Sequence, residues 1–199
     1  MEQKRMNWQY LVEQLSGAKY YLGVVTSETK PFHVAFDPGL TDAEVAQIEL
    51  QHGFRFPPDL RAFLQTALPI GPGFPEWRGD NVRSPTAWMR GVKEGIFFDV
   101  EHNAFWLEEW TARPYSDVAA IEAAAAFLDK APLLIPVFGH RMLCCEPLTA
   151  GNPVLSLHQA DVIYYGYDLE DYLRHEFDLD GRQPWPDEIR QIRFWSKLL

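Results

Sequence analysis

Residues 133–177 constrain the fold more than any other part of this sequence. Short runs of β-branched and aromatic residues alternate there with turn signals at Gly139-His140 and at Gly151. The stretch ends in apolar residues at helical spacing, with Asp168 as a predicted N-cap. This pattern predicts three or four short strands followed by a covering helix. We therefore expect an α+β fold with a central, mostly antiparallel sheet flanked by helices.

Helix signals occur on both sides of that stretch. Thr41 and Glu44 form a capping box, because each side chain can bond the other residue's backbone N–H. Pro57 and Pro58 suit a first helical turn, since their missing N–H groups would be unpaired there. The first three expected helices cover 8–15, the stretch from the capping box to Gly53, and the stretch from Pro58 to residue 68. Two more begin after Ser116 and after Asp168. The last begins at Trp185, with Ile189, Ile192 and Trp195 facing inward.

The other segments give weaker patterns. They predict a strand at 20–25, a connector at 31–39, an exposed loop with an aromatic anchor, Trp77, at 69–85, and strand or turn at 95–100. A length of 199 residues with 47% apolar content favours one domain with a full core. Within it we distinguish an N-terminal helix and connector at 1–39, a core at 40–180 and a C-terminal helix at 181–199.

The charge balance limits the class of partner. The net charge is −10, from 28 Asp and Glu against 18 Lys and Arg. This sign opposes binding to nucleic acid or anionic lipid, whose phosphates require clustered cations. No apolar run approaches the roughly 20 residues that span a bilayer, and the N-terminus lacks a signal-peptide pattern. We expect a cytoplasmic protein with a cationic protein partner and no membrane or nucleic-acid contact.

The sequence contains no motif for a metal or cofactor. Neither C-x-x-C nor H-E-x-x-H occurs, and no glycine-rich phosphate loop is present. Cys144 and Cys145 are adjacent, so on a strand they point to opposite faces and cannot both bind one ion. A hydrolase built on either cysteine with His140 or His158 is an alternative, although no nucleophile elbow G-x-S-x-G supports it. We expect a protein without catalytic activity.

Carboxylates concentrate near the C-terminus. Residues 161–188 contain nine Asp and Glu but only two bases, Arg174 and Arg182. This bias predicts an acidic face on the helix after the sheet, which would steer a basic protein onto it. The alternative is an ordinary solvated surface. The candidate partner-binding residues are His140, Arg141, Asp168, Glu170, Asp171, Glu176 and Asp178.

Residues 40–77 resemble the N-terminal signature of the SUKH superfamily, which includes the yeast cell-wall assembly regulator domain. The matching residues are Leu40, Glu49, Gly53, Phe54, Pro57, Leu60, Phe63 and Leu64, and the similarity continues through Pro136, 151–157, 161–166, Tyr172 and Phe177. The resemblance implies an α+β fold and protein binding. Many bacterial members are immunity proteins that block toxins, and the family has no catalytic residues to carry over.

Together these observations give a leading hypothesis and two alternatives. The leading hypothesis is a non-catalytic binding module, an immunity protein of the longer bacterial branch, that neutralises a basic toxin such as a nuclease. A regulatory scaffold of the yeast type is the first alternative. The small hydrolase using Cys144 or Cys145 is the second.

Overall fold

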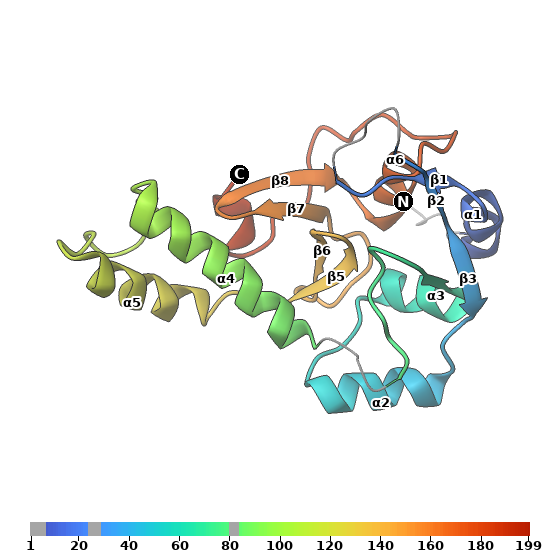
Figure 1. The fold of residues 1–199 in the computed structure, drawn as a ribbon, viewed down its shortest axis with the longest axis horizontal. Helices are drawn as coiled ribbons and strands as arrows, with labels where there is room; N and C mark the ends of the chain where they lie inside the picture. Colours follow the sequence, from blue (N-terminus) through green and yellow to red (C-terminus); the bar gives the residue numbers. More distant parts are fainter. Residues whose placement is uncertain (1–6, 24–28, 80–83) are drawn as a thin grey trace.

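The computed structural model describes residues 7–23, 29–79 and 84–199 and has an α+β fold. Its centre is a four-stranded antiparallel sheet in the order β5-β6-β7-β8 (Figure 1). The strands are β5 Leu134–Phe138, β6 Arg141–Cys144, β7 Val154–His158 and β8 Asp161–Gly166. The expectation of a central antiparallel sheet within 133–177 is confirmed.

The helices lie on both faces of this sheet. They are α1 Trp8–Leu15, α2 Asp42–His52, α3 Pro58–Thr66, α4 Pro85–His102, α5 Asp117–Leu128 and α6 Leu169–Glu176. Figure 1 shows α4 and α5 on one side of the sheet and the α1, α2 and α3 group on the other. Within the described ranges, no helix combines the length and the apolar character needed to span a bilayer.

The pleat of the sheet supplies two separate hydrophobic cores. Leu143 packs with α1, α2, α3 and α6, whereas Met142 and Cys144, its neighbours on β6, pack with α4 and α5. Alternate residues of a strand point to opposite faces, so one strand can serve both cores. Cys145 lies on the side opposite Cys144, as the sequence predicts.

The local helix signals are confirmed. At the start of α2, the Glu44 N–H donates to Thr41 Oγ1 over 3.2 Å and the Thr41 N–H donates to Glu44 Oε2 over 2.7 Å. Gly53 ends that helix in the left-handed conformation. Ser116 caps α5, and Asp168 caps α6 by accepting from the Asp171 N–H over 2.8 Å.

Two short ladders were only partly predicted. β1 Lys19–Tyr20 pairs with β2 Phe32–His33, and β3 Ala35–Pro38 pairs with β4 Ala67–Ile70. The strand expected at 20–25 is therefore reduced to β1 in the described part, and 24–28 lie outside it. The connector prediction for 31–39 is wrong, because β3 pairs with residues 29 to 35 positions further along the sequence.

Residues 95–100 were predicted as strand or turn but lie within α4. Ile96 and Val100, four residues apart, are fully buried against the sheet, so tertiary packing selects the helix. Gly95 allows this approach, since a Cβ there would lie 3.0 Å from the Gln159 Cα. In the predicted loop at 69–85, β4 extends to Ile70 and Trp77 is a buried packing residue.

The expected C-terminal helix at 181–199 is absent from the structure. The segment is irregular apart from one 3₁₀ turn, Trp195–Lys197. Ile192 and Trp195 are buried as predicted, and side-chain hydrogen bonds to distant carbonyls attach the segment to the rest of the protein. Arg190 donates to Ala150 O and the Trp195 indole donates to Pro132 O, each over 2.8 Å.

The close contact between β8 and α6 gives a stability test. A Cβ on Gly166 would lie 2.5 Å from Tyr172 Cβ and 2.7 Å from its Cα. We expect Gly166→Ala to lower the free energy of unfolding by about 1–3 kcal/mol, because the helix must move away from the strand. Urea denaturation would measure the loss. Ile163→Ala, at an exposed position of the same strand, should change stability much less; equal effects would contradict the close approach.

Candidate functional site

Arg141, a predicted binding residue, is held within the protein. Its guanidinium lies 3.8 Å from the centroid of the Tyr165 ring and donates to Ser156 Oγ over 3.2 Å. Its Nε is 3.4 Å from Glu176 Oε2, and the group also lies against the His140 ring. Because these groups surround the guanidinium, Arg141 has little charged surface left for contact with a partner.

Glu176 is likewise a structural residue. Its side chain is 16% exposed, and burial raises the pKa of the carboxyl while Arg141 and the Tyr172 hydroxyl oppose that rise. Tyr172 is completely buried, which raises the pKa of its phenol well above the usual range. Arg141, Glu176 and Tyr172 therefore form a buried polar cluster between the sheet and α6.

The acidic face expected on α6 is much smaller than the sequence suggests. Glu170 pairs with Arg174 over 2.8 Å, and Asp171, which is 2% exposed, pairs with Arg182 over 3.2 Å. The Asp168 side chain is the N-cap of α6 and accepts a hydrogen bond from the Asp171 N–H. Of the predicted acidic residues, Asp178 is the one that is exposed. The carboxylates of Glu170 and Asp171 are therefore paired with arginines of the same chain.

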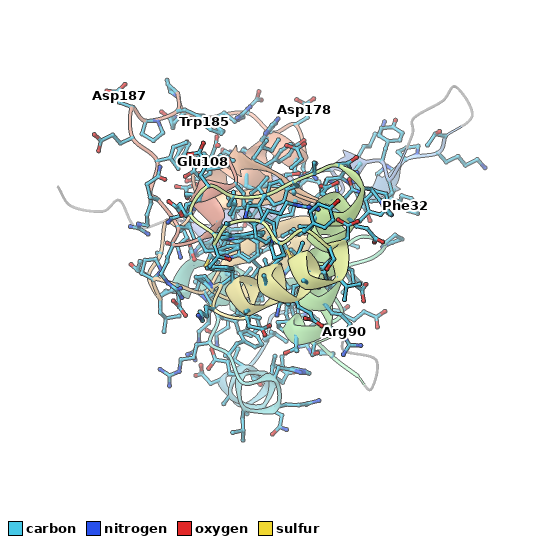
Figure 2. The ribbon with its side chains drawn as sticks, turned by 90° about the vertical axis from the view of Figure 1, so that its left-hand side faces the viewer. Phe32, Arg90, Glu108, Asp178, Trp185 and Asp187 are labelled. Atoms are coloured by element: carbon cyan, nitrogen blue, oxygen red, sulfur yellow. The ribbon has the colours of Figure 1, made fainter. Side chains whose placement is uncertain are left out.

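Exposed carboxylates occur instead on the segment 178–188, which follows α6. Asp178, Asp180, Asp187 and Glu188 are exposed there, and Trp185 among them is 41% exposed. Figure 2 shows Asp178, Trp185 and Asp187 along one edge of the molecule. We call this segment the acidic ribbon.

The structure does not bring the proposed hydrolase residues together. Cys144 is buried, which raises the pKa of its thiol to about 12, and its Sγ accepts from the Glu146 N–H over 3.4 Å. His140 precedes β6 and is four residues from Cys144, which corresponds to roughly 13 Å on an extended strand. His158, the last residue of β7, lies near His140, because the N–H of its neighbour Leu157 donates to His140 O over 3.2 Å. In the described residues, no group of three or more His, Cys, Asp or Glu could hold a metal ion.

A groove of about 690 Å³ lies along the loop that follows β4, a site that the sequence reasoning missed. The loop at 70–77 forms most of it, and Asp37 of β3 and Trp88 of α4 complete it. In Figure 1 this part of the chain passes from beside α3 toward α4. The Gly and Pro residues at 69–75 indicated a loop, but not what the loop packs against.

The comparisons with known proteins give no match: no family model, no curated protein and no solved structure is similar to this chain. The resemblance to the SUKH superfamily therefore rests on the sequence positions given above. The structure itself defines the class as an α+β protein whose four-stranded antiparallel sheet lies between two helical layers, with two smaller two-stranded sheets.

Removing Arg141 should reveal its structural role. Arg141→Met leaves the buried Glu176 carboxylate without its cation, so we expect a loss of about 3 kcal/mol in unfolding free energy at pH 7. The double variant Arg141→Met with Glu176→Gln should recover part of that loss, because no unpaired charge remains. Urea denaturation measures both. If Arg141→Met were as stable as the parent, Arg141 would be free for a partner.

Asp168 should make stability depend on pH. Burial, with a smaller contribution from Glu170 and Asp171, raises the pKa of its carboxyl from 3.8 to about 6. The folded state then binds the proton more tightly than the unfolded state, so stability falls as pH rises from about 4 to 6. Asp168→Asn keeps an N-cap acceptor and removes this titration.

We therefore expect Asp168→Asn to be about 1–3 kcal/mol more stable than the parent at pH 8, with the advantage vanishing at pH 4. Thermal denaturation across pH 4–8 would show the two curves converge at low pH. Asp178→Asn, at an exposed site just beyond the other end of α6, serves as the control. A pH-independent difference for Asp168→Asn would contradict the raised pKa.

Proposed function

We propose that this chain is a non-catalytic protein-binding module that acts in the cytoplasm as an immunity protein against a basic toxin, such as a nuclease. The observation that carries the proposal is the partition of charge in the structure. Half of the Lys and Arg form ion pairs within the chain, and Asp and Glu outnumber them by ten.

Nine of the chain's 18 Lys and Arg form ion pairs within the described ranges. These pairs are Arg61–Asp42, Arg78–Glu44, Lys93–Asp129, Arg113–Asp117, Arg141–Glu176, Arg174–Glu170, Arg182–Asp171, Arg193–Glu146 and Lys197–Glu109. Arg190 is bound to Ala150 O and Asn152 Oδ1. Each of these pairs neutralises one cation and one carboxylate, so the excess of Asp and Glu behind the net charge of −10 remains and the field around the protein is negative.

Such a field attracts a basic protein and raises its association rate, and it repels nucleic acid. An acidic inhibitor that covers a basic nuclease uses the same charge that the nuclease uses to bind its substrate. The family resemblance points to the same role. The separation of Cys144 from His140 and His158, together with the buried thiol, supports a protein without catalytic activity over the hydrolase alternative.

Co-expression with a candidate toxin domain from a neighbouring gene would test the proposal. We expect a complex that co-elutes in size-exclusion chromatography, protects the host cell, and associates about tenfold more slowly when salt rises from 50 to 300 mM. Asp187→Asn with Glu188→Gln should slow association more than the matched pair Glu94→Gln with Glu122→Gln on α4 and α5. If the adjacent genes encode no toxin domain, or that domain does not bind at 50 mM salt, the immunity role is wrong.

A further inference from the structure

We infer that the groove along the loop at 70–77 is the docking site for an extended segment of a protein partner, in which a Lys or Arg lies next to an apolar residue. The inference rests on the proposed function, because it takes the partner to be a protein with a basic surface. It adds the place of contact and the kind of segment recognised.

Part of the wall of the groove is apolar and accessible. Ile70 is 38% exposed, Pro72 is exposed and Pro75 is half-buried, while Phe74 and Trp77 are buried beneath them. An apolar side chain placed among these residues would leave water and contact ring and proline surfaces. The groove is therefore suited to an apolar anchor.

The loop is rigidly held, so binding would not have to order it. The Gly73 carbonyl accepts from the Gly139 N–H over 2.8 Å, and the Pro72 carbonyl accepts from the Tyr20 hydroxyl over 3.0 Å. A Cβ on Gly73 would lie 2.6 Å from the Phe138 ring, which shows how closely the loop packs on the sheet. A preformed site binds a segment at lower entropic cost than a mobile loop.

The free charges of the groove are negative. Arg78 lines it, but its guanidinium donates to Glu44 Oε1 over 2.6 Å, to Pro38 O over 2.8 Å and to Gly39 O over 3.1 Å. Asp37 and Glu76 are exposed at the groove, and neither lies within ion-pair distance of a described cation, although the charge of Asp37 helps to raise the pKa of Arg78. A Lys or Arg of the partner would supply the missing positive charge.

An exposed apolar patch continues the groove toward β1 and β2. Leu22 and Phe32 are 37% and 41% exposed. A Cβ on Gly73 would lie 3.2 Å from Leu22 Cδ2, and Phe32 stacks on Tyr20, whose hydroxyl holds the loop. Figure 2 shows Phe32 at the periphery of the molecule. A ligand that covers both areas must present apolar side chains at several points, as an extended peptide does at every second residue.

The test uses the intact chain and a phage-displayed library of random 12-residue peptides. We expect the selected peptides to share a Lys or Arg within two positions of an aliphatic residue. Binding of the fluorescein-labelled peptides should weaken about tenfold in Asp37→Asn with Glu76→Gln, and in Ile70→Ser. In amide and indole NMR spectra, bound peptide should shift the signals of Trp77 and Trp88.

Two matched controls remove carboxylates or an aliphatic side chain at exposed positions away from the groove. Glu94→Gln with Glu122→Gln deletes two exposed carboxylates, and Ile163→Ser changes an aliphatic side chain that is 46% exposed on β8. Both should bind the peptides as the parent does. The inference is overturned if no peptide is enriched, if the enriched peptides lack a basic residue, or if the groove variants bind them as well as the controls.

The outcomes also separate this inference from the proposed function. If the adjacent toxin domain binds but no groove-dependent peptide is selected, the immunity role stands and the groove is not a docking site. If groove-dependent peptides are selected but no toxin domain binds, the groove stands and the immunity role fails.

Discussion

Burial of the sheet on both faces is the constraint on which the rest of this structure depends. Leu134 and Ile135 are adjacent on β5, point to opposite faces and are both completely buried, so each face needs its own helical layer. Under such cover a charged residue must find a partner inside the protein. Arg141 satisfies this requirement with Glu176 and the Tyr165 ring, which is why a residue chosen for its charge proves to be structural.

Local patterns predicted the parts of the fold that are decided locally. The capping box at Thr41, the caps at Ser116 and Asp168, and the strands of 133–177 depend on neighbours in sequence, and all are present. The wrong predictions concern segments whose structure depends on contacts with residues distant in sequence. The segment at 95–100 is helical because it packs on the sheet, whereas 181–199 is irregular apart from a 3₁₀ turn and is attached to the body by hydrogen bonds from Arg190 and Trp195 to distant carbonyls.

The candidate site could be predicted only in part, because the number of charged residues in a segment does not show which side chains face solvent and which are buried. Asp171 and Asp178 contribute equally to such a count, yet Asp171 is buried against Arg182 and Asp178 faces solvent. The groove is harder still to predict. Asp37, the loop at 70–77 and Trp88 are separated along the chain, and only the pairing of β3 with β4 and the start of α4 bring them together.

If both proposals hold, the acidic ribbon and the groove make different contributions to binding. Exposed carboxylates such as Asp187 act at a distance, so they raise the rate of encounter and are weakened by salt. The groove acts after encounter, when an apolar side chain leaves water beside Ile70 and a cation meets Asp37 or Glu76. Contacts of that kind mainly slow dissociation. Changes in the ribbon should therefore appear in the association rate and changes in the groove in the dissociation rate, so kinetics can separate the two surfaces even where equilibrium affinities agree.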